Sequence, residues 1–295
     1  MCTTCEASRL GVTRRGLLAG TGAVGALGAA GVLGTVAPAV ARQAAPAHAP
    51  VPRLLVFSRT AGFRHASIEV GVETVKQLGD EHGFEVEATE ERGAFTRRNL
   101  ATFNAVLFLN TTGNVLLPRG RTALRDFLLS GGGWAGVHSA ADTEYDWPFY
   151  TRILAGSRFL CHPVQQPGVV VRENSRHLST RHLEERWQIP FEEFYSFTRT
   201  PRDSAKILLT IDESTYRQDP NTSQLPNEQG EIPEGTTGVM GYHPMSWQHQ
   251  LGDGLSWYTA LGHEIGMYED PAYRQHLLGG LLTVLSHGRR RVSPG

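Results

Sequence analysis

Cysteine and net charge are both scarce in this chain of 295 residues, and each scarcity excludes a class of protein. Three cysteines are present, and only Cys161 lies beyond residue 41. No disulfide can therefore form within the later part of the chain, whose fold must depend on its core. The formal net charge is −1, which argues against a nucleic-acid-binding protein that acts through bulk charge. Glycine and proline follow no period, which excludes a collagen-like chain.

Residues 1–41 have the pattern of an export signal. The Arg14-Arg15 pair precedes a weakly apolar stretch over 19–36, and small residues at 39–41 resemble a cleavage site. Paired arginines in this position are typical of a twin-arginine signal. A membrane anchor is the alternative, but the stretch is rich in glycine and alanine and lacks a charged stop-transfer flank. We expect a cleaved signal, a disordered linker over 42–52, and a secreted protein without membrane contact after cleavage.

Beyond the linker, short apolar runs alternate with helical patterns. Strands are predicted over 54–57, 84–88, 105–109, 134–137, 169–171, 194–197, 207–211 and 257–261, and helices over 68–82, 96–101, 118–130 and 272–285. This alternation predicts a mostly parallel sheet with helices on both faces, in a single α/β domain. The domain is expected over 53–288, with a long surface loop at 216–235 and a C-terminal tail at 289–295.

Polar segments follow several of the predicted strands. His65, His138, Asp142 and His263 each lie shortly after a strand. Parallel strands place their carboxyl ends on one edge of a sheet, and ligands bind at that edge in doubly wound folds. The sequence therefore predicts one site that contains these four residues.

The segment 136–140 lies at a strand-to-helix turn, where a nucleophile elbow would stand. Its tip is His138, with Ser139 next, so the pattern does not provide a serine or cysteine nucleophile. His138 either acts in the site or satisfies local backbone groups, and both interpretations remain open. Cys161 is expected to be a small buried hydrophobe, because neighbouring residues in a strand point to opposite faces and Cys161 cannot readily cooperate with His162.

Histidine is abundant, with twelve residues, all beyond residue 41. His65, His138, His162 and His263, together with Asp142 and Glu193, could form a divalent metal site with nitrogen and oxygen donors. None of these residues has a local two-ligand spacing such as H-E-x-x-H, so a hydrogen-bonded cluster without metal is the alternative. Among the aromatic residues, Trp147 and Trp247 are expected to reach a ligand from polar loops, since each lies near a proline.

Several longer motifs resemble those of the ThuA-like (trehalose-utilisation) family. They are Phe63-Arg64-His65-x-x-Ile68, the stretch from Gly131 to Asp142, Phe159-x-x-His162-Pro163, Glu192-Glu193-Phe194-Tyr195, the stretch from Met240 to Trp247, and the stretch from Trp257 to His263. They occur in the family's order over about 53–288. The resemblance implies a flavodoxin-like fold similar to class I glutamine amidotransferases, and it places His138 where those enzymes have their catalytic cysteine. Glutamine amidotransferase activity is therefore not expected.

The resemblance also implies a connection with sugars. We expect a protein that acts on a carbohydrate or sugar derivative by His/Glu acid–base chemistry, as a hydrolase or isomerase, with the help of a divalent metal. His138, Glu193 and Asp142 are the predicted catalytic residues, and His65, His162 and His263 the predicted metal ligands. The predicted substrate-binding residues are Ser139, Trp147, Tyr195 and Trp247. The alternative is a carbohydrate-binding domain without catalysis.

Overall fold

The computed structural model describes residues 50–201, 205–219 and 235–289. The predicted signal and most of the linker, of the predicted surface loop and of the tail lie outside these residues. None of the helices in the described part combines the length and the hydropathy that crossing a lipid bilayer requires.

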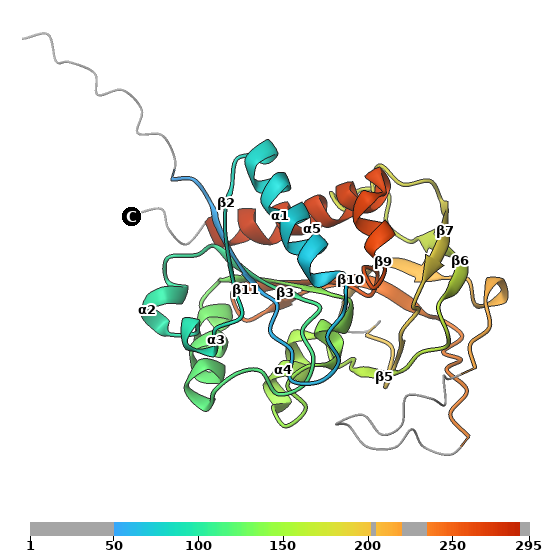
Figure 1. The fold of residues 1–295 in the computed structure, drawn as a ribbon, viewed down its shortest axis with the longest axis horizontal. Helices are drawn as coiled ribbons and strands as arrows, with labels where there is room; N and C mark the ends of the chain where they lie inside the picture. Colours follow the sequence, from blue (N-terminus) through green and yellow to red (C-terminus); the bar gives the residue numbers. More distant parts are fainter. Residues whose placement is uncertain (1–49, 202–204, 220–234, 290–295) are drawn as a thin grey trace, which may run out of the picture. The chain divides into compact units, whose positions relative to one another are not determined.

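A mixed sheet of nine strands forms the centre of the fold, in the order β2-β1-β3-β4-β11-β10-β9-β6-β7 (Figure 1). The strands are β1 (Arg53–Phe57), β2 (Glu85–Thr89), β3 (Ala105–Leu109), β4 (Gly133–Val137), β6 (Gln166–Arg172), β7 (Arg186–Glu192), β9 (Lys206–Ile211), β10 (Pro244–Leu251) and β11 (Gly254–Thr259). The five strands from β2 to β11 in this order pair in parallel, and every pairing beyond β11 is antiparallel. A second, two-stranded sheet joins β5 (Phe159–Cys161) to β8 (Ser196–Phe197).

Helices cover both faces of the large sheet. They are α1 (Ile68–His82), α2 (Arg97–Leu100), α3 (Pro118–Leu129), α4 (Pro148–Ile153) and α5 (Pro271–Arg289), with short 3₁₀ segments η1 (Arg92–Ala94), η2 (His138–Asp142), η3 (Glu213–Thr215) and η5 (Ile265–Glu269). In Figure 1, α1 and α5 lie on one side of the sheet, and α2, α3 and α4 lie on the other. The predicted α/β class is therefore confirmed, with parallel pairing confined to five strands.

The core lies around the central parallel strands. Every residue of β3 and β4 is buried. For β3 this agrees with its continuous apolar sequence, which predicts a strand covered on both faces. β2 stands at the edge of the sheet, and its alternating sequence is mostly exposed. These burial patterns explain why the first four strands could be recognised from hydrophobic periodicity alone.

The strand predicted over 194–197 is wrong in its extent. β7 ends at Glu192, and only Ser196 and Phe197 form a strand, in the small sheet. Phe194 is fully buried and Tyr195 nearly so, but neither lies in a strand. The apolar run reflects burial in the core, because a core-facing loop needs apolar side chains as much as a strand does.

The prediction of a loop around Trp247 is also wrong, because this residue lies within β10. The strand pairs with β9 on one side and β11 on the other, and the indole ring is completely buried against Phe197 and Tyr258. Trp247 is therefore a core residue. The polar residues that follow it are accommodated by specific partners, such as the carbonyl oxygen of Ile153, which lies 2.8 Å from Nε2 of His249.

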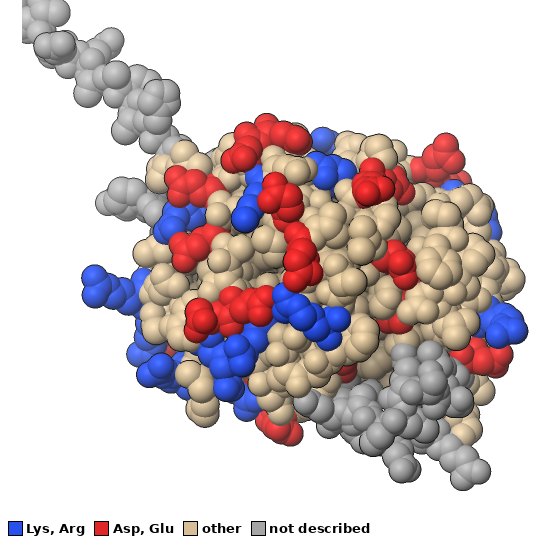
Figure 2. All heavy atoms as spheres, viewed as in Figure 1, with Lys and Arg blue, Asp and Glu red and all other residues tan. Residues whose placement is uncertain are grey.

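Charged side chains of both signs are interspersed over the face seen in Figure 2. Lysine and arginine gather at the side where α2 and α3 lie, and there Arg97 and Arg125 both pair with Asp126. The visible face therefore does not form a continuous field of one sign.

Candidate functional site

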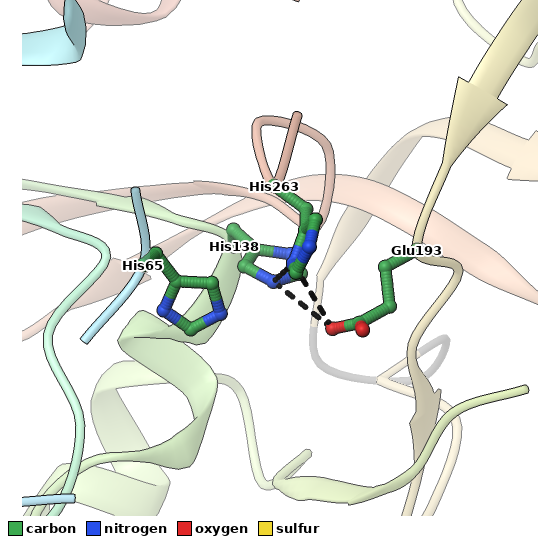
Figure 3. A group of neighbouring side chains, drawn as sticks. All are labelled: His65, His138, Glu193 and His263. Atoms are coloured by element: carbon green, nitrogen blue, oxygen red, sulfur yellow. Dashed lines mark hydrogen bonds and ion pairs between the residues drawn. The ribbon is translucent and has the colours of Figure 1, made fainter. Parts of the chain in front are cut away.

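Four residues that are distant in sequence meet at the carboxyl ends of the parallel strands. They are His65, His138, Glu193 and His263, and one ligand atom of each lies within 4.8 Å of those of the others (Figure 3). His65 follows β1, His138 follows β4 and His263 follows β11, so the topology of the sheet brings the three rings together. Glu193 comes directly after β7, which lies at the far edge of the sheet.

Three donor atoms of this cluster form a compact triangle. Nε2 of His138 lies 3.2 Å from Nδ1 of His263 and 3.4 Å from Oε2 of Glu193. The remaining side, from Nδ1 of His263 to Oε2 of Glu193, is 3.2 Å long. In a tetrahedral site with metal–ligand bonds of about 2.0–2.1 Å, neighbouring ligand atoms stand roughly 3.3–3.4 Å apart. The three donor atoms are therefore spaced like three of the four ligand atoms around a tetrahedral metal ion.

The hydrogen bonds around the cluster determine which nitrogen of each ring faces its centre. Nδ1–H of His138 donates to the carbonyl oxygen of Ala260 at 2.9 Å, which leaves the lone pair of Nε2 directed at Glu193 and His263. Nδ1 of His65 lies 3.3 Å from the hydroxyl of Ser139, so its Nε2 is the nitrogen free for a ligand. Metal-binding histidines are typically oriented in this way by partners of their second nitrogen.

His138 occupies a strained position at the end of β4. It is fully buried, and its φ of 48° lies in the left-handed region that residues other than glycine rarely adopt. Strain of this kind persists at functional sites because the surrounding structure over-determines it. The two interpretations of His138 are compatible, because one nitrogen satisfies a backbone carbonyl while the other faces the cluster.

Burial sets the charge of the histidines. It lowers the pKa of His138 to about 4 and that of His65 to about 2, and neighbouring rings contribute in the same direction. Burial also lowers the pKa of His162. These rings are therefore neutral near pH 7, the state in which imidazole binds a metal or accepts a proton.

Glu193 and His263 form an ion pair within the cluster. Burial favours the protonated form of Glu193, but contacts with His138 and His263 outweigh it and hold the pKa of this carboxyl below its ordinary value. Burial lowers the pKa of His263, yet the hydrogen bond to Glu193 together with the negative charges of Glu193, Glu192 and Glu264 outweighs that effect and leaves the pKa raised. His263 therefore holds a proton more readily than the other rings of the cluster, which suits proton transfer, and it releases this proton when it binds a metal ion.

Glu192 holds the backbone on both sides of this pair. Its Oε1 accepts hydrogen bonds from the backbone N–H groups of Glu193 at 2.8 Å and His263 at 3.1 Å. Its Oε2 accepts from Gly262 N–H at 2.9 Å. The side chain is completely buried, and burial raises its pKa to about 7. Glu192 is therefore a positioning residue for both members of the ion pair.

The loop that carries His263 is also held from its other side. Asn110 donates through Nδ2 to the carbonyl oxygen of Gly262 at 3.1 Å and to the Ser67 hydroxyl at 2.9 Å. Gly262 has a φ of 113°, and a Cβ there would come within 2.3 Å of the Tyr273 hydroxyl, so only glycine fits. The hydroxyl of Ser67 donates to the carbonyl oxygen of Gly262 at 3.3 Å. Ser67 therefore helps to hold this loop, and its side chain makes no hydrogen bond that caps α1.

Replacing Glu192 with glutamine should weaken metal binding by about 10–100-fold. An amide has one acceptor oxygen, so at least one of the three backbone N–H groups would face an NH₂ donor. Zn²⁺ binding measured by isothermal titration calorimetry tests this, with Glu192→Asp as the variant that keeps both acceptor oxygens. Equal affinities for the glutamine variant and the unchanged protein would contradict the positioning role.

The remaining predicted residues lie at different distances from the cluster. His162 is adjacent to it, with Nδ1 3.1 Å from Oε1 of Glu193 and 2.8 Å from the carbonyl oxygen of Pro163. The ring of Tyr195 packs between two histidines, 4.2 Å from His138 and 5.6 Å from His162 between ring centroids. Both residues therefore line the site.

Other predicted residues lie elsewhere. Asp142 is outside the group of ligand atoms, and its Oδ1 accepts a hydrogen bond from the Tyr145 hydroxyl at 2.8 Å. Trp147 is half-buried at the start of α4, where it packs against Phe149 and Tyr150. Cys161 is buried, and burial raises the pKa of its thiol to about 11, so it is not a thiolate nucleophile at neutral pH.

Gln165 is a site residue that the sequence did not indicate. Its Nε2 lies 2.9 Å from Oε1 of Glu193, to which it donates, and 3.3 Å from Nε2 of His263. It comes shortly after the His162-Pro163 pair, and this proximity was the one signal available.

An α/β scaffold with a histidine at its elbow and a buried cluster of histidine and glutamate defines the class of this protein. The family model described as "ThuA: Trehalose utilisation" matches residues 53–282. The chain belongs to the ThuA family, and the resemblance read from its motifs is confirmed. Among curated proteins, none matches this chain.

Solved structures show the same fold. A ThuA-like protein from Bacteroides uniformis ATCC 8492 is 24% identical, with 82% of this chain and 94% of that chain covered and a TM-score of 0.64. A ThuA-like protein from Parabacteroides merdae ATCC 43184 is 17% identical, with 83% and 92% covered and a TM-score of 0.59. The β-galactosidase from Rahnella sp. R3 is 12% identical over 81% of this chain and 32% of that chain, with a TM-score of 0.50. At these identities the likeness concerns the fold alone.

Proposed function

We propose that this protein binds a divalent metal ion through His65, His138, Glu193 and His263 and carries out acid–base chemistry on a carbohydrate or sugar derivative. The observation that carries the proposal is the triangle of donor atoms with sides of 3.2, 3.2 and 3.4 Å. Three imidazoles and one carboxylate are a donor set suited to zinc and similar ions. The connection with sugars is supported by the family, described by trehalose utilisation.

The protein's own groups have separate tasks in this proposal. When bound, a divalent ion polarises a substrate oxygen or lowers the pKa of a bound water molecule. His162 accepts and releases a proton at Nε2, because burial keeps its ring neutral and its Nδ1–H donates to the carbonyl oxygen of Pro163 at 2.8 Å. Tyr195 keeps the rings of His138 and His162 in place by packing between them. His138 and Glu193, which the sequence suggested as catalytic, are ligands here.

Incubation of the metal-loaded protein with trehalose and other disaccharides in D₂O, followed by NMR, tests the proposal. New monosaccharide signals would indicate hydrolysis, and deuterium at a carbon atom would indicate proton abstraction, as in an isomerase. We expect one of these changes, and we expect its loss after treatment with a chelator. Saturable binding without either change would contradict catalysis and support the carbohydrate-binding alternative.

We also propose that residues 1–41 direct export by the twin-arginine route. The support is the Arg14-Arg15 pair before a weakly apolar stretch. Replacing the pair with two lysines should keep the protein in the cytoplasm with its signal uncleaved, because a receptor recognises the arginines and charge alone does not substitute. Fractionation and immunoblotting of cells measure this, and normal secretion of the lysine variant would contradict the proposal.

A further inference from the structure

Half of the exposed large apolar side chains of the described residues stand close in sequence to the candidate site. Eight large hydrophobic residues of the described chain are exposed, and four of them stand two positions from a residue of the site. These four are Phe63 beside His65, Val164 beside His162, Phe191 beside Glu193 and Ile265 beside His263, and we call them the apolar rim. Of the four, Phe63 makes a ring contact with a residue of the cluster, His65.

Phe63 is the most exposed member of the rim, with 68% of its surface accessible. Its ring meets the ring of His65 in a T-shaped contact with centroids 4.9 Å apart. In a contact of this geometry one ring presents its edge to the face of the other, so the two rings do not cover each other as they would when stacked. Phe63 thus places an open aromatic surface directly beside the cluster.

The loop that carries Phe63 is held rigidly. Thr112 binds it at three points: its Oγ1 donates to Phe63 O at 2.8 Å and accepts from Gly62 N–H at 3.3 Å, and its carbonyl oxygen accepts from Ala61 N–H at 2.7 Å. A side chain on a loop that is already ordered loses little further entropy when a ligand packs on it. The exposure of Phe63 is therefore part of a pre-organised surface.

Positive charge is nearly absent next to the site in sequence. Within two positions of the four cluster residues and of His162, the one lysine or arginine is Arg64. Its guanidinium is engaged by Glu69 at 2.7 Å and Glu90 at 2.9 Å. Binding of a phosphate or a carboxylate normally uses an available arginine or lysine, and these neighbouring positions offer none.

We propose that Phe63 binds a neutral sugar ring, which packs its C–H face on the aromatic ring and directs its hydroxyls at the cluster. This inference rests on the proposed function and specifies its substrate class. A pyranose has one face of C–H groups and an edge of hydroxyls, which matches an aromatic platform beside a polar site. A phosphate or carboxylate group finds no free arginine or lysine at these neighbouring positions, so any attraction of an anionic sugar to the bound metal ion should not depend on Phe63.

The test measures sugar binding to the metal-loaded full chain by saturation-transfer NMR and calorimetry. The probes are trehalose, cellobiose and methyl glucoside as neutral sugars, with glucose 6-phosphate and glucuronate as anionic ones. Phe63→Ala should weaken binding of the neutral sugars by about tenfold or more, while Phe63→Trp retains it. Val51→Ala serves as the matched control, because Val51 is an exposed apolar residue before the amino end of β1.

The outcomes separate this inference from the metal site. Zn²⁺ affinity should be the same in Phe63→Ala and in the unchanged protein, so loss of sugar binding with retained metal supports the rim. Unchanged affinity for the neutral sugars in Phe63→Ala, or no binding of any neutral sugar, would overturn the inference, even if metal binds. A change of oligomeric state in Phe63→Ala, seen by light scattering, would instead indicate that the rim is a contact between protein chains.

Discussion

Replacing His138 with alanine should lower the affinity for Zn²⁺ on the order of a hundredfold or more. His138 supplies one corner of the donor triangle, and its Nε2 lies 3.2 and 3.4 Å from the other two atoms. Its removal would leave two close donors and the more distant His65. Competition with a fluorescent chelator measures the affinity over a range wide enough for this loss.

Two variants make the His138 measurement specific. His82→Ala is the matched control, because His82 is exposed on α1 and should not affect binding. Urea denaturation of metal-free His138→Ala should show that the variant is folded, so that lost affinity does not merely report lost structure. Zn²⁺ binding that survives undiminished in His138→Ala would place the metal outside the cluster.

Replacing Trp247 with alanine should destabilise the fold by about 3–5 kcal/mol. The indole is completely buried in β10, with ring centroids 4.5 Å from Tyr258 and 5.2 Å from Phe197. Its removal leaves a cavity between strands that cannot collapse, because β10 is held by neighbours on both sides. Urea denaturation followed by circular dichroism measures the change in the free energy of unfolding.

Trp147→Ala is the comparison for this prediction. Trp147 is half-buried at the start of α4, and its loss should cost clearly less stability. A Trp247→Ala variant as stable as Trp147→Ala, but impaired in sugar binding, would contradict the core assignment and restore the predicted contact with a ligand.

Hydrophobic periodicity predicted the part of the fold that carries the site. The runs before His65 and before Asn110 are continuous and apolar because their strands are covered on both faces. Parallel strands end on one edge, so His65, His138 and His263 could be placed together from local patterns. Glu193 could not be placed in this way, since β7 joins the sheet at its far edge through antiparallel pairs, and only the family motif suggested it.

The errors arise where polar residues are held by specific partners that are distant in sequence. Gln248 and His249 follow Trp247 and resemble a loop sequence, yet they lie within β10. Oε1 of Gln248 lies 2.7 Å from Nε2 of His177, a residue 71 positions away in the chain. Gln165 likewise meets His263 across 98 positions. Periodicity carries no information about such contacts, because they depend on the completed tertiary structure.

X-ray absorption spectroscopy of the Zn²⁺-loaded protein, at a stoichiometry fixed by elemental analysis, is the most direct test of the metal centre. We predict one ion per chain with imidazole scattering from three histidines and one carboxylate oxygen, at bond lengths of about 2.0–2.2 Å. The imidazole contribution should decrease in His65→Ala and remain unchanged in His82→Ala. Failure to bind one ion per chain, or a spectrum that lacks imidazole ligands, would contradict the metal centre and leave the Glu193–His263 pair as a site of proton transfer alone.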